Sequence, residues 1–179
     1  MPDSPGSLIV TGSARGIGAA TARLAASRGY AVCINYLSQR ARAETLAAEL
    51  EGQGGRVIVV QADTAVEADV LRLFETVDRA LGPLAGLVNN AGAGQPAGRL
   101  EDVTLDVLRR TIDVNLIGAM LCAREAVRRM STRRGGKGRA IVNVSSTAGA
   151  RGGAHRYLAY AAAKAGLNTF TLGLAQEVA

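Results

Sequence analysis

Short apolar runs alternate with amphipathic stretches along the whole chain. The apolar runs predict five buried strands, at 8–10, 31–34, 57–60, 84–88 and 140–144. Helical spacing predicts helices at 19–28, 40–51, from 66 onward, at 105–130 in one or two pieces, and from about 158 to the end. Continuously apolar strands are typical of a parallel sheet covered on both faces. The pattern therefore predicts an α/β fold, a Rossmann-like doubly wound parallel sheet with right-handed crossovers.

The segment Thr64-Ala65-Val66-Glu67 has the pattern of a capping box, in which a threonine and a glutamate cap one helix N-terminus reciprocally. We therefore expect Thr64 to cap the helix that begins here. Asp63, which ends the preceding strand, is then left for another role.

Length and composition fit one globular domain over residues 1–179, with residues 1–6 as a flexible tail. No apolar run approaches the roughly 18 residues of a membrane helix, and the N-terminus lacks the features of a secretory signal. Cys33 and Cys122 lie in apolar segments and are expected to be buried thiols in a reducing cytoplasm. With His155 as the single histidine, no metal site is expected.

The net charge of +6 raises the possibility of nucleic-acid binding. The charge comes from nineteen arginines and two lysines spread over several helices, and aromatic residues are only 3% of the chain. The densest basic run, residues 133–139, follows an apolar helix, where cations favour the C-terminus and glycine ends the helix. We therefore expect no nucleic-acid partner and no membrane partner.

The glycine loop, residues 12–18, joins the first strand to its helix and predicts a dinucleotide site. Gly12 permits the turn, Gly16 lets a pyrophosphate approach the backbone, and Gly18 lets the helix pack closely. The second strand ends in Asn35-Tyr36-Leu37-Ser38, without the acidic residue that binds the ribose 2′-OH of NAD. Arg15 is placed to reach a 2′-phosphate, although it is also acceptable as a solvated surface charge. This favours NADP over NAD.

Tyr160 and Lys164 lie four residues apart, on one face of a predicted helix. A free tyrosine is a poor acid at neutral pH, but an adjacent ammonium favours its phenolate form. Tyr157 has Ala161 at the same spacing and lacks such a partner. Ser145 and Ser146 end the fifth strand, where a hydroxyl can hold a substrate oxygen or bond the backbone. Taken alone, the Tyr–Lys pair is as compatible with chance as with catalysis.

Taken in order, these motifs resemble the short-chain dehydrogenase/reductase family. The resemblance runs from about Ser7 to the last residue and rests on Thr11–Gly18, Asp63, Asn89–Gly92, Asn115, Val142–Ser146 and Tyr160–Lys164. Within the family, the chain resembles bacterial NADP-linked glucose 1-dehydrogenases and 3-oxoacyl-carrier-protein reductases, and the run Cys122–Ser131 favours the former. The resemblance implies an oxidoreductase that transfers hydride between a nicotinamide and a carbonyl or alcohol, with a sugar, a polyol or a 3-oxoacyl thioester as substrate.

The resemblance also implies roles for individual residues. Tyr160 would be the general acid/base, Lys164 would favour its phenolate and bind the nicotinamide ribose, Ser146 would orient the carbonyl, and Asn115 would hold a water linked to Lys164. Cofactor contacts would come from Gly12, Ser13, Arg15, Gly16, Ile17, Gly18, Asp63, Asn89, Ala91, Gly92, Tyr160 and Lys164. Members of the family usually assemble as homodimers or homotetramers.

Family members continue after the Tyr–Lys helix with a sixth strand, a substrate-covering loop and a final strand, whereas this sequence ends at Ala179. We therefore expect a C-terminally truncated family domain with an open edge on the fifth strand. The alternative function is a dinucleotide-binding module that does not catalyse.

Overall fold

The computed structural model describes residues 5–178. Within them, five parallel strands form one sheet with the order β3-β2-β1-β4-β5. The strands are β1 (Ser7–Val10), β2 (Ala31–Tyr36), β3 (Val57–Gln61), β4 (Leu84–Asn89) and β5 (Ala140–Asn143). The chain winds outward from β1 to β3 and then returns to place β4 on the other side of β1. This arrangement confirms the predicted doubly wound sheet, with its switch point between β1 and β4.

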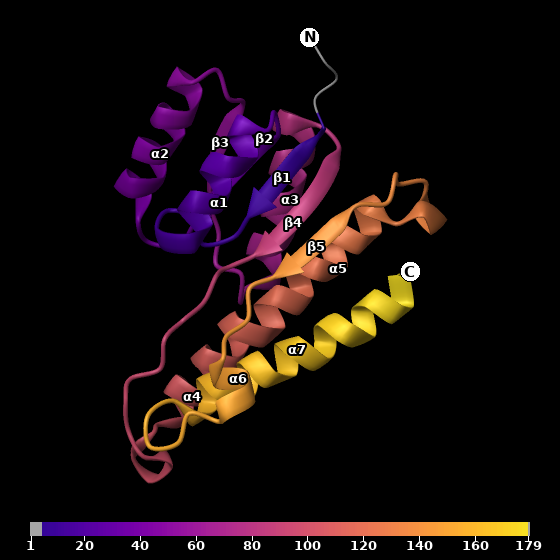
Figure 1. Cartoon of the computed structure of the whole chain (residues 1–179). Helices are drawn as coiled ribbons and strands as arrows, with labels where there is room; N and C mark the ends of the chain where they lie inside the picture. The colour runs from indigo at the N-terminus through magenta and orange to yellow at the C-terminus, as the bar shows by residue number, and fades with distance from the viewer. Residues whose placement is uncertain (1–4, 179) are drawn as a thin grey trace.

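Helices cover both faces of the sheet (Figure 1). Side chains of α1 (Gly16–Ser27) and α2 (Arg40–Gly52) share one core with Val32 and Ile34 of β2. Side chains of α3 (Glu67–Leu81) and α5 (Gly118–Met130) share the other core with Ala31 and Cys33. Because neighbouring side chains of β2 enter opposite cores, all six residues of the strand are buried, as the continuous apolar run predicts.

The stretch predicted as helical over 105–130 contains two α-helices with a π-helical turn between them. Thr104 Oγ1 accepts a hydrogen bond from Val107 N at 3.4 Å and so caps α4 (Leu105–Ile112). The turn η2 (Asp113–Ile117) then leads into α5. Turns of this kind occur often at functional sites, and this one carries Asn115, which is buried.

The C-terminal helix α7 (Leu158–Val178) follows the short helix α6 (Ala148–Arg151). Figure 1 shows α7 running beside α5, with α4 and α6 near its first turns. The 3₁₀ turns η1 (Leu100–Asp102) and η3 (Thr132–Arg134) complete the secondary structure of the described residues. The basic run follows the end of α5 as predicted, and Gly135 adopts a left-handed conformation there.

The predicted capping box is wrong. Helix α3 begins at Glu67, and its N-terminal neighbour Val66 makes no side-chain cap. Asp63 Oδ1 instead accepts a hydrogen bond from Ala65 N at 3.0 Å, while Asp69 Oδ2 accepts one from Asp63 N at 2.8 Å. Aspartate forms such turns readily. Asp63 therefore accepts from the N–H of Ala65, the residue that follows Thr64. Thr64 packs against Gly118 of α5.

The predicted tail over residues 1–6 falls partly outside the described residues, which exclude 1–4. Gly6, at the end of that predicted tail, accepts a hydrogen bond from Ala31 N at 3.1 Å and is therefore attached to the sheet. None of the helices within residues 5–178 has the length and apolar character that a bilayer crossing requires. Cys33 and Cys122 are buried free thiols, and burial raises the pKa of Cys122 to about 12.

Candidate functional site

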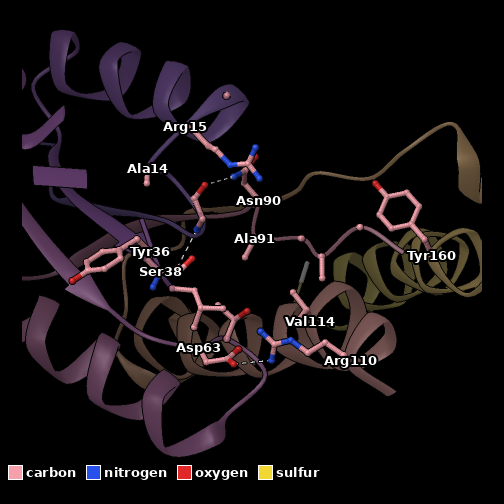
Figure 2. A pocket seen from close by; sticks show the side chains of 18 of the residues that line it. Ala14, Arg15, Tyr36, Ser38, Asp63, Asn90, Ala91, Arg110, Val114 and Tyr160 are labelled. Carbon is pink, nitrogen blue, oxygen red and sulfur yellow. Dashed lines mark hydrogen bonds and ion pairs between the residues drawn. The ribbon is translucent and has the colours of Figure 1, made fainter. Parts of the chain in front are cut away.

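A cavity of about 660 Å³ lies where the loops after all five strands meet. Its lining residues include parts of the loops after β1, β2, β3, β4 and β5, together with Arg110, Val114, Tyr157 and Tyr160. Figure 2 shows Arg15 and Tyr36 on one side of the cavity and Tyr160 on the other, with Ala91 between them. The cavity therefore occupies the switch point, where doubly wound sheets bind ligands.

The glycine loop presents backbone to this cavity. Gly16 has a φ of +59°, and a Cβ atom placed on it would meet no atom within 4 Å. A Cβ on Gly18 would lie 2.5 Å from Asn90 Nδ2 and 2.8 Å from Ser13 Cα. Gly16 thus leaves open space beside its backbone, whereas Gly18 allows close packing. No side chain caps the N-terminus of α1 and no acidic residue lies in its first turn, so this helix end favours an anion.

Asn35, whose role the sequence reasoning missed, holds the glycine loop in place. Its Oδ1 accepts a hydrogen bond from Gly12 N at 3.0 Å, and its Nδ2 donates to the carbonyls of Val60 and Ala62 at 3.3 and 3.1 Å. Ser13 N donates to Asn35 O at 2.8 Å, and Ser13 Oγ accepts from Asn35 N at 3.1 Å. An amide is needed here because the site requires both an acceptor and two donors. The available signal was an asparagine directly after the apolar run 31–34.

All but one of the residues predicted for the site fall into two groups. Those that line the cavity are Gly12, Arg15, Gly16, Asp63, Ala91, Gly92, Ser146 and Tyr160. Buried behind the lining are Ser13, Gly18, Asn89, Asn115 and Lys164. Ile17 does neither, since 66% of its surface is exposed on α1.

Tyr160 and Lys164 lie on successive turns of α7, as predicted. Lys164 Nζ lies 5.8 Å from the centroid of the Tyr160 ring and donates a hydrogen bond of 2.8 Å to Val144 O. Lys164 is only 4% exposed, and this burial lowers the pKa of its ammonium. Tyr157 lines the same cavity and contacts Tyr160 edge to face, with ring centroids 6.1 Å apart.

Asn115 leaves one buried acceptor without a partner. Its Nδ2 donates to Ala93 O at 2.8 Å and to Thr111 O at 2.9 Å. Its Oδ1 is buried and accepts no hydrogen bond from residues 5–178. A buried polar atom of this kind suits an ordered water. Asn89 similarly uses Nδ2 on Ala119 O and Asn143 Oδ1, and its own Oδ1 has no donor within the described residues.

The two serines after β5 point to different partners. Ser145 Oγ donates to Lys164 O at 3.4 Å. Ser146 lines the cavity, and its Oγ accepts a hydrogen bond from Ala148 N at 3.1 Å. The Ser146 hydroxyl proton therefore remains available for an oxygen in the cavity.

Arg110 is a second cation of the cavity that the sequence reasoning missed. Its Nη1 lies 2.6 Å from Asp63 Oδ2. The ion pair joins α4 to the end of β3 across 47 residues, so no local pattern reveals it. Figure 2 shows the pair on the lower wall of the cavity. At the end of β2, Ser38 and Gln39 line the wall without adding a carboxylate.

Comparison with known proteins agrees with this geometry. The family model described as short chain dehydrogenase matches residues 7–179. The chain belongs to the short-chain dehydrogenase family. Among relatives of this family, the uncharacterized oxidoreductase YgfF of Escherichia coli K12 is 43% identical over 96% of this chain and 69% of its own length. A 3-oxoacyl-acyl-carrier-protein reductase of Synechocystis is 36% identical over 96% of this chain and 67% of its own length.

Solved structures of short-chain dehydrogenases show the same fold. A short chain dehydrogenase from Burkholderia cenocepacia J2315 in complex with NADP is 37% identical with a TM-score of 0.89, covering 97% of this chain and 69% of that one. A blue fluorescent protein from a metagenomic library in complex with NADPH is 37% identical with a TM-score of 0.88, covering 97% of this chain and 68% of that one. The chain thus spans about two thirds of the length of these proteins.

Proposed function

We propose that this chain forms the cofactor-binding and proton-transferring part of an NADP-dependent oxidoreductase that interconverts a carbonyl and an alcohol. The observation that carries the proposal is one cavity reached by the glycine loop from one end and by Tyr160 from the other. The similar structures in complex with NADP and NADPH support the choice of cofactor.

The residues of the cavity fit a dinucleotide phosphate. The uncapped N-terminus of α1 and the open space beside Gly16 suit a pyrophosphate. Arg15 lines the same cavity as the residues that follow β2, where the lining contains Ser38 and Gln39 instead of an acidic residue. This charge pattern suits a ribose 2′-phosphate better than a free 2′-hydroxyl.

When bound, the nicotinamide supplies or accepts the hydride. The chain orients the substrate oxygen and handles the proton. In the reductive direction, Ser146 donates a hydrogen bond to the carbonyl oxygen, and the Tyr160 hydroxyl gives its proton to that oxygen as negative charge develops. The ammonium of Lys164 stabilises the resulting phenolate. The unpartnered Oδ1 of Asn115 suits a water that returns a proton toward Lys164.

Sugars, polyols and 3-oxoacyl thioesters are the substrate classes we propose. The Synechocystis relative, a 3-oxoacyl-acyl-carrier-protein reductase, supports the last class. We further propose a homodimer or homotetramer in which α5 and α7 supply the contacts, as the long helices usually do in members of this family. Two buried free thiols support a reducing compartment, and we propose the cytoplasm.

Calorimetric titration of the chain with NADPH and with NADH tests the cofactor assignment. We expect NADPH to bind at least about tenfold more tightly, because Arg15 adds a charged contact to the extra phosphate. NADPH oxidation is then followed with aldose, ketose and 3-oxoacyl thioester substrates. Equal affinity for the two cofactors would refute the NADP assignment, and tight NADPH binding without turnover would favour the non-catalytic binding module.

A further inference from the structure

The β4 loop, residues 90–99, crosses to the N-terminus of α7 and caps it with a side chain. Gln95 Oε1 accepts hydrogen bonds from Ala159 N at 3.0 Å and from Tyr160 N at 3.3 Å. These are among the first N–H groups of α7, which begins at Leu158 and whose early N–H groups lack partners within the helix. Gln95 therefore does, from 64 residues away, what a capping residue next to a helix usually does.

The residues just before α7 do not include a local cap. Arg156 and Tyr157 precede Leu158, and neither is a serine, threonine, aspartate or asparagine. Gln95 supplies the missing acceptor. Its position in the cavity lining places this cap beside the proposed reaction centre.

The two backbone donors fix the orientation of the Gln95 amide. Only its oxygen can accept from Ala159 N and Tyr160 N, so the NH₂ group must face elsewhere. That NH₂ group has no hydrogen-bond partner within residues 5–178. The side chain thus bonds the helix through one end only.

Two further contacts hold the β4 loop against the elements around Tyr160. Asn115 Nδ2 donates to Ala93 O at 2.8 Å, and Gly98 N donates to Arg156 O at 3.2 Å. Gln95 lies between these two attachment points. The same loop contributes Ala91 and Gly92 to the cavity lining, so its attachment to α7 sets where Tyr160 stands relative to the rest of the cavity.

We propose that Gln95 is a positioning residue for Tyr160. The proposal rests on the proposed function, in which Tyr160 transfers the proton. By capping α7, Gln95 fixes the backbone of Tyr160 against the β4 loop, which lines the cavity next to the glycine loop. Its removal frays the first turn of α7 and misplaces the phenol, and displacements of about 1 Å can cost roughly a hundredfold in rate.

Two substitutions that keep the length of the Gln95 side chain test whether its acceptor oxygen is the part that matters. Gln95→Met keeps the length but has no strong acceptor, whereas Gln95→Glu keeps oxygens that accept from both N–H groups. Gln53→Met, at the exposed end of α2, is the matched control. We expect the Ala159 and Tyr160 amides to exchange with deuterium about fivefold faster in Gln95→Met and to stay protected in Gln95→Glu and in the control.

Kinetics of the same variants test the effect on Tyr160. We expect kcat to fall about tenfold or more in Gln95→Met with NADPH affinity unchanged, and Gln95→Glu to recover most of kcat. An unchanged exchange rate in Gln95→Met would overturn the cap, and an unchanged kcat would overturn the positioning role. Equal loss of kcat in Gln95→Glu would overturn it as well, because the NH₂ group would then be the part that matters.

The exchange measurement does not depend on activity. If the unmodified protein fails to bind NADPH or to turn over, the proposed function fails. Even then, faster exchange of the Ala159 and Tyr160 amides in Gln95→Met would establish the cap. An unchanged exchange rate would refute it.

Discussion

The side-chain oxygen of Asn35 accepts a 3.0 Å hydrogen bond from the backbone N–H of Gly12, which ties the end of β2 to the start of the glycine loop. The same side chain donates to two carbonyls, those of Val60 and Ala62. One amide thus connects the loop after β1 with the end of β3. The shape of the glycine loop therefore depends on a residue that lies outside it.

We predict that Asn35→Ala lowers the free energy of unfolding by about 3 kcal/mol, because three buried hydrogen bonds are lost and their partners stay unsatisfied. NADPH affinity should fall as well. Asn35→Asp should be at least as damaging, since a carboxylate would face two carbonyl oxygens. Urea unfolding measures the effect, with the exposed Gln53→Ala as a control that changes stability by less than about 0.5 kcal/mol. A similar small change in Asn35→Ala would show that the network is not needed.

Tyr160→Phe should reduce kcat by about 10² to 10⁴ while NADPH affinity changes by less than about twofold, because only the proton donor is removed. Tyr157→Phe is the matched comparison, since Tyr157 lines the same cavity and contacts the Tyr160 ring. We expect it to keep most of kcat. Steady-state kinetics and cofactor titration of both variants decide the matter, and the reverse pattern would assign proton transfer to Tyr157.

Arg15→Ala should weaken NADPH binding about tenfold or more and leave NADH binding nearly unchanged, because the lost charge–phosphate contact exists only with NADPH. Arg28→Ala, at the opposite end of α1, should affect neither cofactor. Calorimetry at two salt concentrations gives both affinities and their electrostatic component. Parallel losses for NADPH and NADH would place Arg15 on the pyrophosphate instead.

The burial of Lys164 should make the folding stability of the protein depend on pH. Its pKa in the folded protein lies below the ordinary lysine value of 10.5, and desolvation is the cause. Between the lowered pKa and 10.5, the unfolded chain holds a proton that the folded chain has released, so folding stability gains with rising pH. Below the folded pKa, the cost of burying the ammonium is present in full.

A variant without the amine lacks this dependence. We therefore predict that the stability of the protein relative to Lys164→Met increases as the pH rises toward 10.5, the ordinary lysine pKa. Both proteins should carry Tyr160→Phe, so that the neighbouring phenol does not contribute. Urea unfolding across this range provides the measurement. A constant difference would mean that Lys164 titrates alike in the folded and unfolded chains.

The strands and the elements that carry the motifs were predictable because apolar runs and glycine spacing are local properties. The site residues Gly12, Asp63, Ser146 and Tyr160 all lie at strand ends or on the following helix, as a parallel sheet requires. The start of α3 was not predictable from the capping-box pattern, because Asp63 forms a turn in which its side chain accepts from Ala65 N and its carbonyl accepts from Val66 N, and the helix begins only after that turn. The sequence shows both residues but not which of them bonds.

The parts of the site that sequence reasoning missed join residues far apart in the chain. Arg110 meets Asp63, and Gln95 meets the start of α7, through contacts that no spacing pattern encodes. The π-helical turn that brings Asn115 inward lies inside a stretch that reads as ordinary helix. Such contacts depend on how the packed elements meet.

The strand order has a consequence for folding during synthesis. β1 is made first but lies in the middle of the sheet, and its partner on one side, β4, begins only at Leu84. While the ribosome makes the intervening residues, β1 can pair with β2 alone, and its other edge stays open to incorrect pairing. Until β4 has been made, the half that contains β1, β2, β3 and their helices lacks the strand that pairs with the second edge of β1. Slow translation through residues 62–83 would lengthen that exposed period.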